Sequence, residues 1–298
     1  MIYRSFNIVS CDEEEHIVKP PPFAYSRPST LAEALDLLAG DEGALPLAGG
    51  QSLVPMLNMR LARPTTIGDI GQVSELLGVQ NETGSVTVGA RVTHHNLARL
   101  SALHAVKALP RAVAEIGFPA IRHRGTVGGS LAHADPAAEL TTLLVAIDAT
   151  VVLASTAGER RLRLDDFLLG YYSTSRRPDE LITGVTIPTP PGLATGFAEF
   201  SRRPGDFALA LCAVATWHQE GGGQAARVVI GGLDVRPRRI TSLEDSLVRQ
   251  PPTEAFEAAT PELLATFTSP ATDIHGSADY RLQVGSEMVR RALSQVAA

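Results

Sequence analysis

The sequence predicts an α+β protein built from two units in tandem. Its 298 residues are about twice the length of an average domain, and 44% are hydrophobic, which suffices for a buried core. Predicted strands and helices alternate in the first part of the chain, whereas three predicted strands precede two predicted helices in the last part. A cluster of proline and glycine residues at 188–192 separates the two patterns and is typical of a linker.

The first unit follows an irregular N-terminal extension, residues 1–19, that ends at consecutive prolines. Thr30 and Glu33 form a capping box that predicts a helix, and Gly40 stops this helix. The other elements predicted before the linker are an apolar stretch at 44–48, a helix at 53–61, strands at 65–70 and 86–89, helices at 93–100 and 111–116, a hairpin of strands at 149–154 and 160–164, and a strand at 181–187.

The second unit opens with strands predicted at 196–202, 209–218 and 225–231, which form a three-stranded antiparallel meander. Two helices follow. The first begins near Thr241, with Glu244 as the second member of a capping box. The second is terminal and carries an apolar stripe at helical spacing. The stripe consists of Tyr280, Val284, Met288, Val289, Ala292 and Val296.

Composition excludes several classes of function. A net charge of -6 argues against a nucleic-acid partner, which needs a basic surface. The two cysteines, Cys11 and Cys212, are too few for a disulfide framework or for an iron–sulfur cluster, which needs about four ligands. Only Lys19 and Lys107 are lysines, and neither follows a glycine-rich loop, so a Walker A loop is absent. Without a signal-like N-terminus or a run of about 18 apolar residues, we expect a cytoplasmic protein without a membrane span.

Two glycine pairs are the strongest candidates for a binding site. They lie at 48–52, with the sequence AGGQS, and at 126–130, with the sequence TVGGS. Consecutive glycines let backbone N–H groups converge into an anion nest. The two segments together therefore predict that a diphosphate binds between them. A single glycine pair is more often a tight turn, and that interpretation stays open for each segment alone. No GxGxxG opens a helix, so a nucleotide would not bind as in a Rossmann fold.

Acidic candidates follow the second glycine pair. Asp135 before Pro136 predicts a helix cap with proline at the first helical position, and Glu139 then lies about one turn into the helix. A carboxylate at this place can accept a hydrogen bond from a ribitol or ribose hydroxyl, or it can simply offset the helix dipole. Both roles of Glu139 stay open.

Motifs for other chemistries are incomplete. The segment 128–132 resembles the hydrolase motif GxSxG but lacks its last glycine. The spacing of the histidines matches no set of metal ligands, so no metal site is expected. Basic clusters at 122–124, 202–203 and 236–239 are usually solvated or ion-paired, although the first can help to attract a diphosphate to the second glycine pair.

Four segments carry a resemblance to a known family. They are Pro22-Phe-Ala-Tyr25 with a helix start at Pro28, 46–55 with PLAGGQSLVP, 121–132 with IRHRGTVGGSLA before Asp135-Pro136, and 202–208 with RRPGDFA. From about Pro20 to the C-terminus, the chain resembles the FAD-binding medium subunit of the molybdenum hydroxylase family, the group of carbon monoxide dehydrogenase and xanthine dehydrogenase. The resemblance implies an FAD-binding domain of the p-cresol methylhydroxylase type at 20–190 and a CO dehydrogenase flavoprotein C-terminal-like domain at 195–298.

The resemblance also implies a function, that of the flavoprotein subunit of a molybdenum-containing hydroxylase or dehydrogenase. In this family, substrate is hydroxylated on a large molybdopterin subunit, and electrons pass through 2Fe-2S clusters on a small subunit to non-covalent FAD and then to an external acceptor. Both subunits are therefore implied as partners, in a dimer of heterotrimers. The low cysteine count agrees with this, because the clusters must lie on a partner.

The resemblance assigns cofactor contacts but no catalytic acid or base and no metal ligand. Gln51 replaces a frequent histidine, which excludes covalent attachment of the flavin there. The flavin-side lysine of several relatives, expected at 199–201, is absent, and Arg202 is the candidate to replace it. The implied cofactor-binding residues are Leu47, Ala48, Gly49, Gly50, Gln51, Ser52, Leu53, Ile116, Thr126, Val127, Gly128, Gly129, Ser130, Asp135, Glu139, Ile182 and Arg202.

Two other functions stay open from the sequence. A stand-alone flavin reductase of the cell-wall-precursor type also binds FAD through glycine pairs, but the segment RRPGD at 202–206 argues against it. A non-catalytic nucleotide-binding scaffold is the third possibility, and a flavin spectrum of the purified protein would exclude it.

Overall fold

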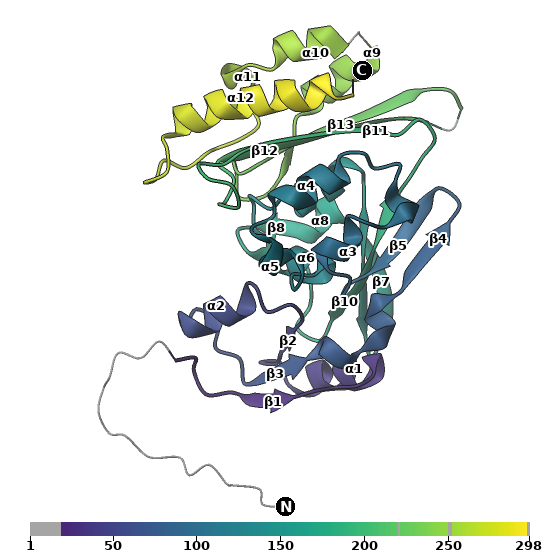
Figure 1. Ribbon diagram of the computed structural model, residues 1–298, viewed down its shortest axis with the longest axis vertical. Helices are drawn as coiled ribbons and strands as arrows, with labels where there is room; N and C mark the ends of the chain where they lie inside the picture. Colours follow the sequence, from purple (N-terminus) through teal and green to yellow (C-terminus); the bar gives the residue numbers. More distant parts are fainter. Residues whose placement is uncertain (1–18, 220, 250–251, 297–298) are drawn as a thin grey trace, which may run out of the picture.

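The chain folds into two stacked units (Figure 1). The computed structural model describes residues 19–219, 221–249 and 252–296, so the predicted N-terminal extension lies outside the described residues except for Lys19. The first unit runs from β1 (Ala24–Ser26) to β10 (Leu181–Pro188), and the second runs from β11 (Ala194–Phe200) to α12 (Ala278–Ser294). The residues 189–193 connect them, where proline and glycine predict a linker.

A five-stranded antiparallel sheet is the centre of the first unit. Its strand order is β4–β5–β10–β6–β7, so the last strand of the unit lies in the middle of the sheet. The predicted hairpin is confirmed, with its turn before Gly158, whose φ of 129° suits glycine. The other bounds are β4 (Val79–Glu82), β5 (Ser85–Gly89), β6 (Thr150–Ser155) and β7 (Gly158–Arg163).

A small parallel sheet precedes the five-stranded one. Its order is β1–β3–β2, with β2 (Leu45–Leu47) and β3 (Thr66–Asp69). Thr30 caps α1 (Leu31–Gly40) by accepting a hydrogen bond from the Glu33 N–H at 3.2 Å, which confirms the predicted helix start. The other elements before β5 are α2 (Leu53–Asn58) and the 3-10 helices η1 (Ile70–Gln72) and η2 (Ser74–Leu77).

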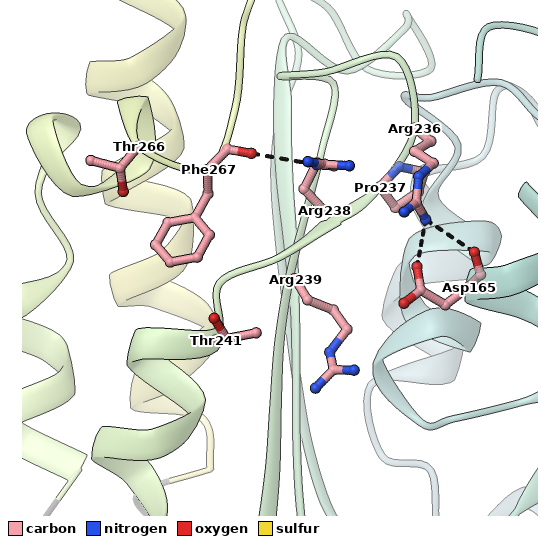
Figure 2. Close-up of a pocket in the computed structure, with 8 residues that line it drawn as sticks. All are labelled: Asp165, Arg236, Pro237, Arg238, Arg239, Thr241, Thr266 and Phe267. Carbon is pink, nitrogen blue, oxygen red and sulfur yellow. Dashed lines mark hydrogen bonds and ion pairs between the residues drawn. The ribbon is translucent and has the colours of Figure 1, made fainter. Parts of the chain in front are cut away.

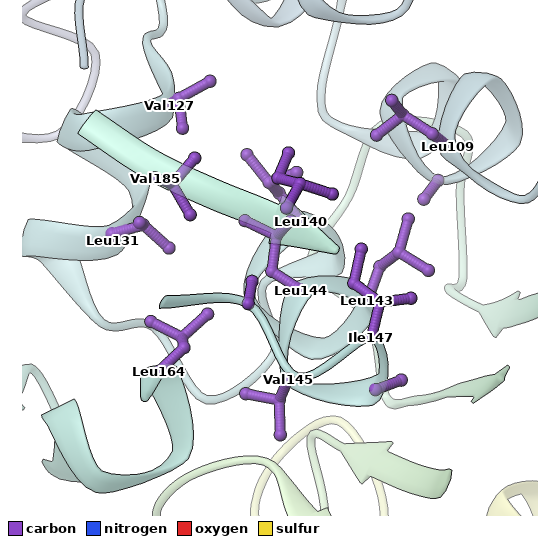
Figure 3. Close-up of a cluster of buried hydrophobic side chains, with 14 of the residues drawn as sticks. Leu109, Val127, Leu131, Leu140, Leu143, Leu144, Val145, Ile147, Leu164 and Val185 are labelled. Atoms are coloured by element: carbon purple, nitrogen blue, oxygen red, sulfur yellow. The ribbon is translucent and has the colours of Figure 1, made fainter. Parts of the chain in front are cut away.

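Helix α7 (Glu139–Ala146) forms the core between the two units. Its residues from Leu140 to Ala146 are all buried, because the helix packs against the sheet of the second unit on one side and against the helices and sheet of the first on the other. Figure 3 shows its leucines beside Leu109, Val185 and Leu164. The surrounding elements are α3 (His94–Leu97), η3 (Ser101–Leu103), α4 (Leu109–Glu115), α5 (Pro119–Arg122), α6 (Val127–His133), α8 (Leu164–Phe167), β8 (Leu168–Gly170) and β9 (Ser173–Thr174).

The second unit is an antiparallel sheet covered by helices. One face of the sheet, with Phe197 and Leu211, joins the core around α7, and the other, with Ala198 and Cys212, packs under the C-terminal helices (Figure 1). Its order is β11–β12–β13–β14. The bounds are β12 (Ala210–His218), β13 (Gln224–Gly231), β14 (Arg238–Arg239), α9 (Thr241–Arg249), α10 (Pro252–Ala258) and α11 (Pro261–Ala265).

The structure differs from the sequence predictions in several elements. A two-residue strand, β14, extends the predicted three-stranded meander, and four helices rather than two follow β13 in the described residues. The predicted capping box at Thr241 does not form, because the Glu244 carboxylate accepts hydrogen bonds from Arg239 and from the Val228 N–H instead. Strand β4 is exposed along its length, and it has no apolar alternation that could have revealed it.

Candidate functional site

The two glycine segments line one cavity of about 470 Å³, whose wall comes from the first unit and from residues 205–207 of the second. This volume falls in the range of about 300–1,000 Å³ that small-molecule and cofactor sites occupy. Most residues predicted to bind the cofactor lie in its wall. They are Ala48, Gly49, Gly50, Gln51, Ser52, Leu53, Ile116, Thr126, Gly128, Gly129, Ser130, Asp135, Glu139 and Ile182.

The two glycine segments approach each other closely enough to exclude side chains. A Cβ built on Gly49 would overlap the carbonyl oxygen of Arg124, and one on Gly128 would lie 2.6 Å from the Cβ of Ala90. Only glycine therefore allows this packing. The Arg124 Nε also donates a weak hydrogen bond of 3.4 Å to the Gly49 carbonyl oxygen, which links the first segment to the residues just before the second.

The first segment presents free backbone donors. Gly50 has a φ of 75°, in the left-handed region that favours glycine. None of the N–H groups from Gly49 to Ser52 donates a hydrogen bond to another residue of the described chain. Adjacent N–H groups left without acceptors beside a cavity fit the predicted anion nest.

The second segment has a different geometry from the predicted nest. Thr126 is the N-cap of α6, and its hydroxyl accepts a hydrogen bond from the Gly129 N–H at 3.1 Å. The N–H groups of Val127 and Gly128 donate, at 3.0 and 2.8 Å, to carbonyl oxygens of the loop that follows β5. These donors are occupied, so the segment is a capped helix start rather than an open nest. It offers the cavity a smooth glycine surface and the side chain of Ser130.

The acidic candidates line the cavity, but the helix start is not the predicted one. Helix α7 begins at Glu139, and the Asp135 carboxylate accepts a hydrogen bond from the Ala137 N–H at 2.8 Å in a turn before it. Glu139 therefore lies at the first residue of the helix rather than a turn inside it. Burial raises the pKa of Glu139 to about 7, and the charge of Asp135 acts in the same direction.

A second buried carboxyl lies near Glu139. Glu199, on β11, stands where the lysine of several relatives is expected, so this chain has an acidic side chain there instead of a basic one. Its Oε2 atom is buried without a hydrogen-bond partner. Burial, together with the charges of Glu139 and Glu115, raises the pKa of Glu199 to about 9. Glu199 is therefore protonated at neutral pH.

Three predicted contact residues lie outside the cavity wall. Leu47 and Val127 pack into hydrophobic clusters, and Arg202 is exposed. The loop that carries Arg202 instead contributes 205–207, a glycine, an aspartate and a phenylalanine. Gly205 has a φ of 79°, and its Cβ would lie 3.1 Å from the Gly117 carbonyl group, so glycine is required for this loop to reach the cavity.

Some cavity residues have no motif that predicts them. His94 is 5% exposed, and its ring packs on Gly125 close to the backbone of Thr126, yet neither ring nitrogen makes a well-aligned hydrogen bond. Burial lowers the pKa of His94 to about 4, so the ring is neutral. In the sequence, the histidine spacings match no set of metal ligands, so no pattern marks His94 as a residue of the cavity. His133 stacks against Tyr172 in the same wall, with ring centroids 4.9 Å apart.

A second cavity, of about 310 Å³, contains the basic cluster 236–239 (Figure 2). Arg236 pairs with Asp165 of α8 at 2.6 Å, and Arg239 pairs with Glu244 at 2.6 Å. The expectation of ion pairing for this cluster is confirmed. Because α8 belongs to the first unit, the Arg236–Asp165 pair ties the two units together.

The described residues hold neither a candidate membrane-spanning helix nor a candidate metal site. Within residues 19–219, 221–249 and 252–296, no helix has the length and apolar character of a membrane span. The same ranges contain no group of three or more histidine, cysteine or acidic side chains arranged to hold a metal ion.

The fold and the cavity together define a nucleotide-binding protein that uses glycine segments without a Rossmann fold. Residues 21–190 match the family described as the FAD binding domain in molybdopterin dehydrogenase, and residues 195–296 match the CO dehydrogenase flavoprotein C-terminal domain. The chain belongs to the FAD-binding medium subunits of the molybdenum hydroxylase family. It is therefore an oxidoreductase subunit.

Individual relatives agree with this family over almost the whole chain. The nicotine 6-hydroxylase medium subunit of Paenarthrobacter nicotinovorans is 37% identical, covering 94% of this chain and 99% of the relative. The carbon monoxide dehydrogenase medium chain of Hydrogenophaga pseudoflava is 33% identical, with coverage of 92% and 97%. The crystal structure of quinoline 2-oxidoreductase from Pseudomonas putida 86 has 38% identity and a TM-score of 0.86, covering 94% of this chain and 98% of that one.

Proposed function

We propose that this chain binds FAD non-covalently in the 470 Å³ cavity and passes electrons from a molybdenum hydroxylase to an external acceptor. The observation that carries the proposal is the unoccupied row of N–H donors from Gly49 to Ser52, held against the second glycine segment by contacts that only glycine permits. Such donors suit a diphosphate. When bound, FAD supplies two-electron redox chemistry that no side chain of the protein can provide.

The chain's own residues would bind and orient this cofactor. The first glycine segment would hold the diphosphate, while the closed second segment would form the opposite wall. Glu139, with a pKa of about 7, can accept or donate a hydrogen bond to a hydroxyl of the ribitol or ribose. Ile116 and Ile182 would supply apolar surface. Gln51 offers no nucleophile, in keeping with non-covalent binding.

The partners follow from the cofactors that this chain lacks. We infer a small subunit with 2Fe-2S clusters as the electron donor and a large molybdopterin subunit as the site of hydroxylation, in a dimer of heterotrimers. The names of the relatives support this, because they describe medium subunits or medium chains. A cytoplasmic location is a further prediction, which cell fractionation can check.

The test compares flavin binding by matched glycine variants of the full chain. Gly49→Ala places a Cβ against the Arg124 carbonyl oxygen, whereas Gly40→Ala meets no atom within 4 Å and is the control. We expect a flavin absorbance spectrum for wild type and Gly40→Ala and loss of flavin for Gly49→Ala. Wild-type protein that takes up no FAD would contradict the proposal. Purification from the native host as a flavoenzyme without molybdenum and iron would refute the subunit role.

A further inference from the structure

Arg176 is the one arginine or lysine among the described residues that line the cofactor cavity. It lies between β9 and β10 and is half-buried. The carboxyl groups in the same wall belong to Asp135, Glu139 and Asp206. Arg176 is therefore the one cationic side chain of the described cavity wall that can attract the negative charge of the proposed cofactor.

The backbone of its own turn holds the Arg176 guanidinium in one orientation. Its Nη1 donates to the carbonyl oxygens of Arg177 at 2.9 Å, Pro178 at 3.2 Å and Glu180 at 2.6 Å. Because a guanidinium is planar, anchoring one nitrogen by several bonds also fixes the direction of the others. The Nε and Nη2 atoms have no partner among the described residues.

No carboxylate neutralises Arg176 directly. Glu180 and Asp179 attract Arg176 through their charge without forming an ion pair with it. Glu180 is engaged by Arg160 in a two-fold contact of 2.5 and 2.8 Å and accepts a further bond from the Arg177 N–H at 2.7 Å. Arg176 forms no ion pair with any described residue. A guanidinium that is partly withdrawn from water and has two nitrogens without protein partners can donate charge-assisted hydrogen bonds to an anionic ligand.

We propose that Arg176 is the cationic anchor of the cavity, which donates charge-assisted hydrogen bonds to anionic oxygen atoms of the bound flavin nucleotide. This inference rests on the proposed function. The negative charge has two sources in one ligand, the permanent charge of the diphosphate and the charge that the flavin ring gains on reduction. Arg176 is a positioning residue in either case, and the two sources can be separated by experiment.

The experiment titrates the full-length apoprotein with FAD and, separately, with riboflavin, which lacks the diphosphate. Arg176→Leu removes the charge, and Arg176→Lys keeps the charge without the planar guanidinium group. Arg177→Leu is the control, because Arg177 is an exposed arginine next to Arg176. The loss of a charge-assisted hydrogen bond should weaken FAD binding by Arg176→Leu roughly 10- to 100-fold. Arg177→Leu should bind FAD as wild type does, and Arg176→Lys should fall between.

The readouts identify the source of the charge. If Arg176 binds the diphosphate, Arg176→Leu weakens FAD binding but not riboflavin binding. If it faces the reduced ring, Arg176→Leu lowers the FAD midpoint potential, by about 30 mV for each tenfold change in the ratio of the two affinities. Arg176→Leu protein with wild-type affinity for both ligands and an unchanged potential would overturn the proposal. Absence of flavin binding by the wild type would instead reject the proposed function, so the two failures are distinguishable.

Discussion

Replacing Glu199 by glutamine should remove much of the dependence of stability on pH between 6 and 8. Burial, reinforced by the charges of Glu139 and Glu115, raises the pKa of Glu199 to about 9, compared with an ordinary value of 4.5. Between these values the folded chain holds a proton that the unfolded chain releases. The stability is therefore fully present below about pH 4.5 and is lost as the pH rises toward 9.

The magnitude follows from the one proton involved. A difference of one bound proton changes the free energy of unfolding by about 1.4 kcal/mol per pH unit, which is about 2.7 kcal/mol between pH 6 and pH 8. This is an upper value, because Glu199 keeps some exposure and water reduces the cost of its charge. Glutamine keeps the shape of the side chain and cannot ionise, so it removes this contribution.

The assay is urea unfolding of the apoprotein at pH 6, 7 and 8. The exposed Glu42→Gln variant is the control, because it makes the same chemical change without burial. We expect wild type and Glu42→Gln to lose stability together as the pH rises, and Glu199→Gln to lose much less. Equal slopes for Glu199→Gln and wild type would refute the reasoning, because the proton would then belong to another group.

Three other substitutions test the packing and electrostatics of the chain. Because the pKa of folded His94 is about 4, wild type should lose stability as the pH falls from about 6.5 to 4, and His94→Phe should abolish this loss in urea unfolding. If His94→Phe loses as much stability as wild type over this pH range, the assignment to His94 is wrong. Arg236→Ala should cost about 1 kcal/mol by breaking a half-buried ion pair, against under about 0.5 kcal/mol for the exposed Arg161→Ala. Leu144→Ala should cost about 2–5 kcal/mol in calorimetry or urea unfolding, whereas the half-exposed Leu77→Ala should cost far less.

Local patterns predicted most of the elements that carry the site. The cap at Thr30, the hairpin around Gly158 and the strand before Pro188 depend on neighbouring residues only, and all three are confirmed. Short elements without an apolar pattern, such as β1 and β4, were missed because pairing with another strand creates them. Helix α7 shows no apolar stripe confined to one face, because the helix is buried on all sides.

The site was predictable in its location but not in its chemistry. Both glycine segments reach one cavity, as their similarity predicts. The second segment is no nest, however, because its N–H groups bond to the loop after β5, and no local pattern shows where that loop lies. Arg202, the candidate to replace the flavin-side lysine, lies outside the cavity wall for the same reason, since the path of its loop leaves it exposed and brings 205–207 into the wall.

By itself, the sequence determined the order of most of the longer elements, the family, and the need for glycine at Gly50, whose backbone angle is a local property. The two cysteines also determined that this chain cannot supply the ligands of a four-cysteine iron–sulfur cluster by itself. Only the tertiary structure decided that Gly49 meets the Arg124 carbonyl group, that Glu199 keeps its proton, and that Arg176 lines the cavity without an ion pair to a described residue. The physical reason is that burial, charge compensation and the supply of hydrogen-bond partners depend on residues far away in the chain.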